Sequence, residues 1–360
     1  MVFAEVLKRV TDYNVVITTS KLGKQFCEDV GVRAQFMTTT AENSFSNVIL
    51  TYFKRIVLTF ALPLNPEAQD VLYAGSDFLT ETIPVAFHKH RHPQTIWLQH
   101  LFHLIPQDRL IPYLSQRLSL VLIRWGADAI VVDNSLLREH LIKMGLKADK
   151  IHVIYPGIDH EFLSHIKPND TPVTASFMAQ IRESKGIFNL IEIWREVVKE
   201  LSEATLAIIG KGGPTVNEEL KRRIGQHNLS ANIKLCGFLP NKEAYEIIAG
   251  SSLFLFPSHE EGFGIAPLEA QALGVPVVAY DLPVFNEVFP QGMLKVLPND
   301  TATMAREVLR LLRDNKAREE LSVKAKANSA RFDWDKTAEE ELKIIAQLSI
   351  NPKLPAQPDL

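Results

Sequence analysis

The sequence predicts an α/β protein made of two Rossmann-like domains, each a doubly wound parallel sheet, that face each other across a cleft. Two observations support this fold class. Short apolar segments with strand character alternate with helical patterns through most of the chain, which is the rhythm of βαβ units. With 360 residues, 46% of them hydrophobic, the chain is long enough for two domains with cores of their own. Ligands of open parallel sheets bind beyond the carboxyl ends of the strands, and we expect the functional residues there.

The first domain is predicted over residues 1–163. Residues 2–10 carry apolar side chains at helical spacing, and residues 14–19 are expected to form a buried strand. Further strands are expected at 70–74, 95–100 and 129–132, with helical patterns between them. Residues 48–62 carry an apolar helical stripe, which we interpret as a core helix, with a helix on a membrane surface as the alternative.

The second domain is predicted over residues 173–330, after a linker at 164–172 that has two prolines and no periodicity. Its expected strands alternate with helical patterns, and six such strands complete a doubly wound domain: 174–179, 205–210, 233–237, 253–257, 276–280 and 293–297. A helical segment at 331–349 and a proline-rich tail at 350–360 end the chain.

Composition excludes several classes of protein. A formal net charge of −3 argues against nucleic-acid binding, which normally shows as a strongly basic surface. The two cysteines, Cys27 and Cys236, form no metal or disulfide pattern, which favours a reducing compartment. We find no signal-peptide pattern and no apolar run of membrane-spanning length. We therefore expect a cytoplasmic protein, with peripheral contact to the cytoplasmic membrane face as the remaining option.

The strongest functional pattern is the segment 258–278, which follows a strand and enters a helix. Gly262 and Gly264 leave the backbone open, so the amides that follow can point at an anion at the helix N-terminus. Glu269 can then reach the hydroxyl groups of a sugar whose phosphates lie on those amides, and Glu261 faces the cleft. A carboxylate at each end of such a turn suits a nucleotide attached to a sugar. The alternative is a glycine-containing turn with solvated acids.

This segment resembles the retaining glycosyltransferases of family 4, whose hallmark is a pair of glutamates separated by seven residues, as Glu261 and Glu269 are. The resemblance covers nearly the whole chain and continues in KIHVIYPGID (150–159), Lys185-Gly186, 206–212, 233–239 and 332–334. It implies the GT-B fold and transfer of a hexose, with retention, from a UDP- or GDP-sugar to a saccharide or lipid-linked acceptor. No metal and no cofactor beyond the donor substrate are implied.

The resemblance also implies a role for each site residue. Glu269 would bind the ribose hydroxyls, Glu261 would contact the transferred sugar, and the amides of Gly264 and Ile265 would hold the diphosphate. Lys185 would neutralise the charge that develops on the leaving diphosphate. His100, at the end of a predicted strand, would position the transferred sugar, through its backbone carbonyl in one interpretation. The remaining expected donor contacts are Gln180, Arg182, Gly210, Phe238, Leu239, Gly262 and Phe263.

The chain departs from the family at one donor contact. The family places an arginine five residues before the lysine, and Gln180 stands there in this sequence. An amide replaces neither the charge nor the bidentate grip of a guanidinium. Either Arg182, two residues later, covers the phosphate, or the chain is a catalytically weak or non-catalytic homologue that binds nucleotide sugars. An epimerase or phosphorylase with the same fold is a further alternative.

Glycine is scarce in the first domain, where only six of the 17 glycines lie before residue 168. Members of the family open with a strand and a glycine-rich loop, which lead into a helix like 2–10. We therefore expect the first domain to lack its opening strand. The alternating His88, His90 and His92 are interpreted as a solvated basic loop rather than a metal site, because Lys89 and Arg91 lie between them.

Overall fold

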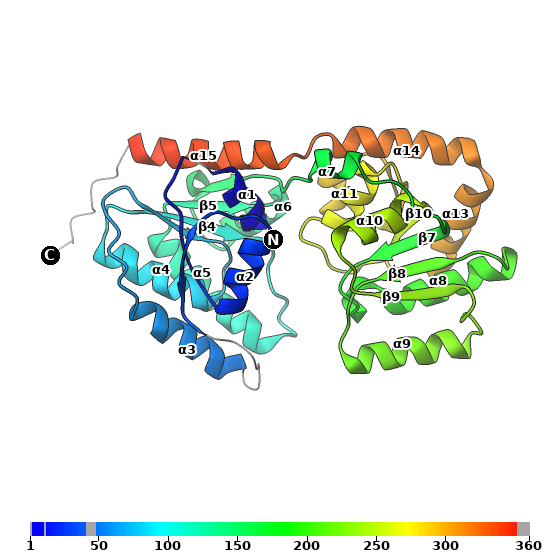
Figure 1. The fold of residues 1–360 in the computed structure, drawn as a ribbon, viewed down its shortest axis with the longest axis horizontal. Coiled ribbons are helices and arrows are strands. Elements are labelled where there is room, and N and C mark those ends of the chain that lie inside the picture. Colours follow the sequence, from blue (N-terminus) through cyan, green and yellow to red (C-terminus); the bar gives the residue numbers. More distant parts are fainter. Residues whose placement is uncertain (1, 11, 41–47, 351–360) are drawn as a thin grey trace. The chain divides into compact units, whose positions relative to one another are not determined.

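The computed structural model describes residues 2–10, 12–40 and 48–350, which fold into two compact units (Figure 1). Unit 1 comprises residues 1–157 and 334–360, and unit 2 comprises residues 158–333. Both units are built on parallel sheets flanked by helices, so the predicted α/β class is confirmed. Of the predicted tail, residues 351–360 lie outside the described residues.

The units divide at 157/158 and 333/334, whereas the sequence placed a linker at 164–172. That segment lies inside unit 2, where the amide of Asn169 donates to the carbonyl of Glu246 at 3.1 Å. Two prolines interrupt the periodicity of this segment without interrupting its packing. The last helix, α15 (Trp334–Ile350), returns to unit 1 and buries Ile344 and Ile345 in its core.

Unit 2 contains a six-stranded parallel sheet in the order β12-β11-β10-β7-β8-β9. All six predicted strands are confirmed, with these bounds: β7 Val173–Met178, β8 Leu206–Ile209, β9 Ile233–Gly237, β10 Ser251–Phe256, β11 Val277–Tyr280 and β12 Met293–Val296. Its helices are η2 Glu183–Lys185, α7 His160–Ser164, α8 Ile187–Glu200, α9 Pro214–Gln226, α10 Asn241–Ala249, α11 Ile265–Ala272, α12 Phe285–Val288, α13 Thr301–Arg313 and α14 Asn315–Ser329. This order is that of a doubly wound sheet, in which the winding reverses between the first strand, β7, and the fourth, β10.

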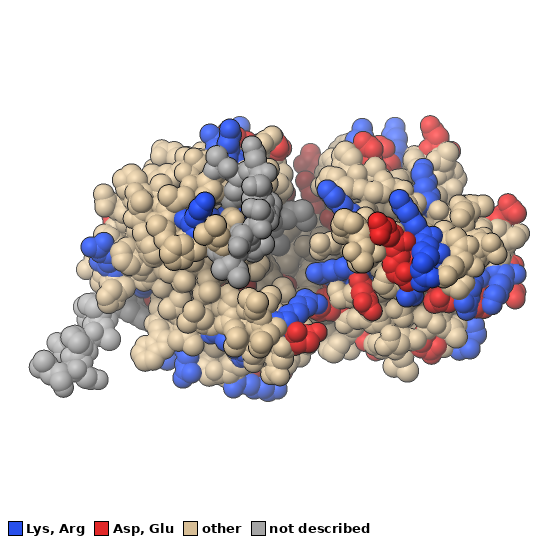
Figure 2. All heavy atoms as spheres, turned by 90° about the horizontal axis from the view of Figure 1, so that it is seen from below, with Lys and Arg blue, Asp and Glu red and all other residues tan. Residues whose placement is uncertain are grey.

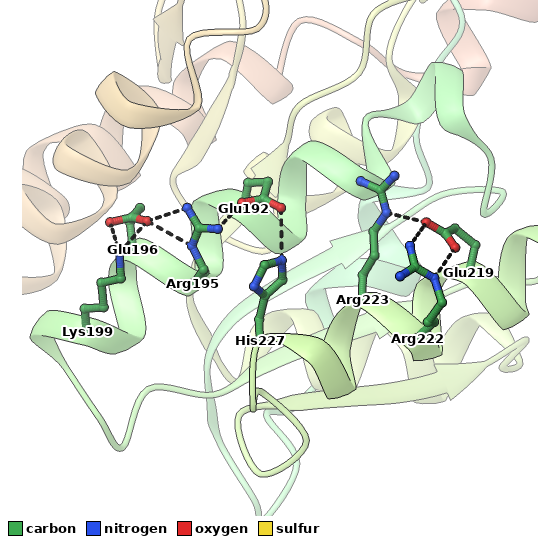
Figure 3. Close-up of polar contacts among 8 residues, drawn as sticks. All are labelled: Glu192, Arg195, Glu196, Lys199, Glu219, Arg222, Arg223 and His227. Atoms are coloured by element: carbon green, nitrogen blue, oxygen red, sulfur yellow. Dashed lines mark hydrogen bonds and ion pairs between the residues drawn. The ribbon is translucent and has the colours of Figure 1, made fainter.

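Charged side chains of α8 and α9 form polar contacts on the surface of unit 2, and one of these contacts links α8 to the residue after α9 (Figure 3). Glu192 on α8 contacts the ring of His227 at 3.2 Å, just after the end of α9. On α9, Arg222 and Arg223 hold the pKa of Glu219 at about 2, and the Arg223 guanidinium lies 4.2 Å from the centre of the Phe188 ring. These exposed contacts hold two neighbouring helices together and are weakened by salt.

Unit 1 contains a four-stranded parallel sheet in the order β3-β4-β5-β6. The strands are β3 Val71–Ala74, β4 Ile96–Leu101, β5 Ala129–Val132 and the short edge strand β6 Ile151–Val153, which the sequence did not predict. On one face Trp97 and Ile130 pack with residues of α4 (Leu79–Arg91), α5 (Leu110–Gly126) and α6 (Ser135–Lys143). On the other face Leu98 and Val131 pack against α15.

A second, two-stranded parallel sheet pairs β1 (Val16–Thr19) with β2 (Gln35–Thr38), next to α1 (Val2–Arg9) and α2 (Lys21–Asp29). The prediction of a buried strand at 14–19 is wrong about burial, since alternate residues of β1 are exposed. Among the described residues β2 is the one strand that pairs with β1, and Ile17 and Phe36 of these strands pack against a small core of Ala4, Cys27 and Val32.

Two expectations for the helices of unit 1 need correction. Residues 48–62 do form a helix, α3 (Val48–Phe60), but its apolar stripe is not buried: Phe53 is 64% exposed. The predicted basic loop at residues 88–92 is instead the end of helix α4, where His88 is buried. Across the part of the chain that the structure describes, no helix is both long and apolar enough to cross a membrane.

Candidate functional site

The carboxyl ends of β7 and β10 form the reversal point of the unit 2 sheet, where doubly wound domains bind ligands. Residues 179–186 follow β7 and residues 257–264 follow β10. The two loops are bonded to each other, because the amide of His259 donates to the carbonyl of Ser184 at 2.9 Å. The hydroxyl of Ser258 donates to the same carbonyl at 3.3 Å. The fold therefore brings together the two predicted parts of the site, the loop that contains Lys185 and the loop that contains Glu261.

Gly186 allows this close approach. Its φ is +69°, and a Cβ at this position would lie 1.7 Å from the carbonyl oxygen of Pro257. Any other residue would push the two loops apart and strain the backbone. The glycine ends the short helix η2 and begins α8, so it fixes the position of its neighbour Lys185.

Lys185 and Glu261 form an ion pair at the centre of these loops. The Nζ atom of Lys185 lies 2.6 Å from Oε1 of Glu261 and also donates to the carbonyl of Glu260 at 3.1 Å. Both side chains are largely buried, at 13% and 10% exposure. A pair this buried holds its members in one geometry, because separating them would leave an uncompensated charge. Two of the three predicted catalytic residues therefore meet.

The N-terminus of α11 opens beside this pair. Gly264 precedes the helix with φ +101°, and no side chain caps the helix start. The first amides of a helix have no partner within the helix and carry its positive dipole end, which favours an anion. Phe263 is buried against the ring of Phe332, with ring centres 5.5 Å apart, and this contact anchors the loop. The predicted phosphate-binding turn therefore lies at a helix start that no side chain caps, and its role toward a phosphate remains a prediction.

Gly264→Ala is expected to lower the free energy of unfolding by about 1–3 kcal/mol, because a non-glycine residue at this φ is strained. The added Cβ would also lie 3.0 Å from Phe285 and 3.1 Å from Phe289. Urea unfolding measures the change. The control is Gly225→Ala in α9, where no atom lies within 4 Å of the added Cβ and stability is expected to rise by up to about 1 kcal/mol. Equal effects of the two substitutions would contradict the strain at Gly264.

Glu269 lies on α11 with its side chain directed into the domain and only 8% of the residue exposed. Its Oε1 accepts a hydrogen bond of 2.6 Å from the hydroxyl of Tyr245 on α10. Burial raises the pKa of Glu269 to about 7, against the opposing effect of that hydrogen bond. Tyr245 was not predicted, because a single tyrosine in an amphipathic helix carries no signal of its own.

The family model described as Glycosyl transferases group 1 matches residues 160–328, which include all the predicted site residues of unit 2. Unit 2 therefore contains a domain of this family. Among its relatives, the D-inositol 3-phosphate glycosyltransferase of Xylanimonas cellulosilytica is 27% identical, over 62% of this chain and 57% of its own length. The amylovoran biosynthesis glycosyltransferase of Erwinia amylovora is 32% identical, over 43% of this chain and 40% of its own. The chain thus spans little more than half of the first of these relatives.

Solved structures confirm the GT-B fold. Anabaena HepE in complex with UDP and glucose superposes with a TM-score of 0.79 at 17% identity, over 96% of this chain and 95% of that one. Staphylococcus aureus TarM gives a TM-score of 0.68 at 17% identity, over 81% of this chain and 58% of that one. At this level of identity, these likenesses show the fold alone.

Arg182 and Gln180, both in the loop after β7, differ in their surroundings. Gln180 is exposed, whereas Arg182 is half-buried at the start of η2. Within residues 2–10, 12–40 and 48–350, the buried Nε of Arg182 and the buried hydroxyl of Ser184 have no hydrogen-bond partner. An unsatisfied buried donor is unfavourable by about 1–3 kcal/mol, so an anionic ligand on this loop would relieve it. This observation supports Arg182 as the phosphate contact.

The loops after β8 and β9 border the same end of the sheet. Gly210 has φ +145°, and a Cβ there would lie 1.8 Å from the carbonyl oxygen of Ala179. Its amide donates to the carbonyl of Gly237 at 2.8 Å, so the loops after β7, β8 and β9 are held together. Phe238 is 78% exposed and Leu239 is half-buried. Their expected contact with the base remains a prediction.

His100 belongs to unit 1, whereas the site residues described above belong to unit 2. Its side chain is 1% exposed, with Nε2 at 3.3 Å from Oε2 of Glu341 on α15 and the ring centre 4.9 Å from that of Tyr73. The Tyr73 hydroxyl donates to the same carboxylate oxygen at 3.0 Å. The backbone carbonyl of His100 accepts from the Gln99 side chain at 2.7 Å. The imidazole is therefore enclosed within unit 1, and its role toward the sugar remains a prediction.

His259, a histidine of unit 2 that the sequence did not mark as a site residue, bonds the two site loops. His259 directly precedes the two glutamates, and its Nε2 lies 3.2 Å from the side-chain oxygen of Asn189 on α8. Burial lowers the pKa of His259, which favours the neutral ring. Its position in the sequence, two residues before Glu261, was the signal from which it could have been predicted. Among the described residues, no group of three or more His, Cys, Asp or Glu side chains could hold a metal ion.

Proposed function

We propose that this chain is a retaining glycosyltransferase that moves a hexose from a nucleotide diphosphate sugar to a saccharide or lipid-linked acceptor. One observation carries the proposal: the Lys185–Glu261 ion pair of 2.6 Å lies at the reversal point of a doubly wound sheet. A cation, a carboxylate and an open helix N-terminus converge there. This combination suits a ligand that joins a diphosphate to a sugar.

In the proposed mechanism the unit 2 loops bind the donor through its charged part. Lys185 and the first amides of α11 hold the diphosphate, and Arg182 adds the guanidinium that the family normally places at Gln180. Negative charge on the diphosphate grows as the bond to the sugar breaks, so fixed positive groups stabilise the transition state more than the ground state. Glu261 accepts hydrogen bonds from hydroxyl groups of the transferred hexose.

Glu269 is the proposed ribose ligand. A carboxylate can accept from two neighbouring hydroxyl groups at once, which is the arrangement that a ribose offers. Because the group lies 8% exposed on α11, water competes little for it. The hydroxyl of Tyr245 already bonds Oε1 and fixes the orientation of the carboxylate.

UDP-sugars are the first donors to test. Anabaena HepE was solved with UDP-glucose, and the pneumococcal O-GlcNAc transferase GtfA with UDP and GlcNAc. The relatives named for amylovoran and colanic acid biosynthesis support a saccharide acceptor. A GDP-sugar remains the alternative donor, because the expected base contacts near Gly210 and Phe238 would use mainly backbone groups.

Calorimetry with UDP, GDP and ADP, followed by hydrolysis of the matching nucleotide sugars, tests the proposal. We expect UDP to bind more tightly than ADP, and slow hydrolysis of a UDP-sugar to release the α-anomer first, as retention requires. Failure of every nucleotide to bind would refute the proposal.

The alternative function is that of a nucleotide-sugar-binding homologue without catalysis. The observation that favours it is Gln180 at the position of an arginine. Tight donor binding with neither hydrolysis nor transfer to a broad panel of acceptors would select this alternative. Donor hydrolysis that is lost in Arg182→Ala would favour the transferase. It would also identify Arg182 as the residue that supplies the guanidinium absent at position 180.

A further inference from the structure

The outer face of α5 is apolar in a way that packing within unit 1 does not explain. Six large hydrophobic residues, each at least 50% exposed, follow one another at helical spacing on this face: Leu110, Ile111, Leu114, Leu118, Val121 and Trp125. The buried face of the same helix includes the polar side chains of Gln116 and Ser119. A surface helix normally turns its apolar stripe inward and its polar residues outward. Helix α5 presents its longest apolar stripe to the outside.

A second apolar stripe lies on α3. Leu50, Phe53, Val57 and Phe60 are exposed and recur at intervals of three and four residues. Helix α4 packs against both α3 and α5, so the three helices form one layer on unit 1. The ring of Phe60 meets the ring of Phe87 on α4, with centres 4.7 Å apart. The exposed stripes of α3 and α5 are called the α3–α5 face below.

The charges of these helices have one sign. Together α3 and α5 contain four basic residues and no aspartate or glutamate: Lys54, Arg55, Arg117 and Arg124. Helix α4 adds Arg91, whose guanidinium lies 5.2 Å from the centre of the Phe87 ring, while its single acid, Glu81, is bonded to Ser76. The nearest acid before α5 is Asp108, which is followed by Arg109. On the face of unit 1 that Figure 2 shows, most visible atoms are uncharged, and the charged groups among them are chiefly Lys and Arg.

We propose that the α3–α5 face binds the surface of an anionic lipid bilayer. Apolar side chains would enter the boundary between headgroups and acyl chains, and the flanking Lys and Arg would attract the anionic headgroups. The charge pattern argues against a second copy of the chain. A symmetric contact through this face would place basic residues against basic residues without acids to pair them. This inference is independent of the donor chemistry proposed above.

Sedimentation of the full chain with vesicles tests the proposal. Vesicles of phosphatidylcholine alone are compared with vesicles that contain about a third phosphatidylglycerol, at low and high salt. We expect binding to the anionic vesicles only, and weaker binding at high salt. Leu114→Glu with Trp125→Glu is expected to reduce this binding by about tenfold or more, because two apolar contacts become repulsive charges. Both residues are exposed, so the melting temperature and nucleotide affinity should not change.

The matched control is Leu297→Glu with Val323→Glu, which replaces two equally exposed apolar residues of unit 2 and adds the same charge. This variant should bind vesicles like the wild type. Arg117→Ala with Arg124→Ala should weaken the preference for anionic over neutral vesicles. Unchanged binding of the α5 variant, or equal binding to neutral vesicles, would overturn the proposal. The proposal would also be overturned if the wild type bound no vesicles but formed a dimer that the α5 variant abolishes and the unit 2 control variant does not.

Discussion

Lys185→Ala is expected to lower the rate of donor turnover by about 10²–10³-fold, the range found when one preorganised group is removed from a transition-state charge. The reason is the position of the ammonium group. Its Nζ is held by Glu261 Oε1 at 2.6 Å and by the Glu260 carbonyl at 3.1 Å, next to the start of α11. Nucleotide affinity should fall less than turnover, because charge on the diphosphate grows in the transition state. Steady-state kinetics of donor hydrolysis and calorimetry with the nucleotide separate the two effects.

Lys211→Ala is the matched control for this substitution. Lys211 follows β8 at the same end of the sheet, but its side chain is exposed. Its removal should change turnover by only a few fold. If Lys185→Ala had as small an effect as Lys211→Ala, the catalytic role of Lys185 would be refuted.

Folding must be measured beside catalysis in this variant. Removing one member of a largely buried pair leaves the other charge uncompensated, which lowers the free energy of unfolding by about 3 kcal/mol. Lys185→Ala with Glu261→Gln removes both charges and should recover much of that loss. The double variant should stay as slow as the single one. Slow turnover in a stable protein then reports on chemistry rather than on unfolding.

Unit 2 could be predicted closely from the sequence because its strands β8, β10 and β11 are buried on both faces. Segments such as Leu253–Phe256 are continuous apolar runs that end at Pro257, so their bounds are visible without knowledge of the fold. Their spacing by helical patterns predicts the doubly wound sheet. The glycines at 262 and 264 mark the turn that leads into helix α11.

Unit 1 was harder to predict because its edge strands are short and lightly buried. Residues 35–38 and 151–153 form strands only because a neighbour pairs with them. The apolar stripes of α3 and α5 are identical in pattern to core-facing stripes, and only the structure shows that they are exposed. Periodicity identifies an amphipathic helix but not what covers it.

Contacts between residues far apart in the chain could not be predicted from the sequence in either unit. Spacing predicted that Glu261 and Glu269 share one turn and helix. It gave no means to find that Tyr245 bonds Glu269, or that Glu341, 241 residues after His100, contacts that histidine. Such contacts depend on how α10 and α15 pack, which no local pattern contains.

Glu269 is expected to make folding and donor binding depend on pH in opposite directions. Burial raises the pKa of its carboxyl from 4.5 to about 7, so the folded protein binds this proton more tightly than the unfolded chain. Its contribution to stability is therefore complete below about pH 4.5 and is lost as the pH rises through about 7. By pH 8 the loss amounts to about 3 kcal/mol.

Glu269→Gln should remove this loss. The difference in unfolding free energy between the variant and the wild type should grow in favour of the variant from pH 5 to pH 8, by about 3 kcal/mol. Urea unfolding at several pH values measures the difference, and any constant effect of the amide cancels. Glu243→Gln on α10, an exposed glutamate, should show no such trend. A pH-independent difference for Glu269→Gln would contradict the raised pKa.

Binding of the nucleotide should respond with the opposite sign, because in the proposed binding mode the ribose hydroxyls would donate to the ionised carboxylate of Glu269. Wild-type affinity should increase as the pH rises from 6 to 8 through the pKa of about 7, with a proton released on binding near neutral pH. Glu269→Ala should weaken binding by about 1–3 kcal/mol at pH 8, the usual effect of losing hydrogen bonds to a charged group, and should abolish the pH dependence. Calorimetry in buffers of different ionisation enthalpy measures both the affinity and the released proton. Equal affinities of Glu269→Ala and the wild type for UDP and for GDP would exclude Glu269 as the ribose ligand.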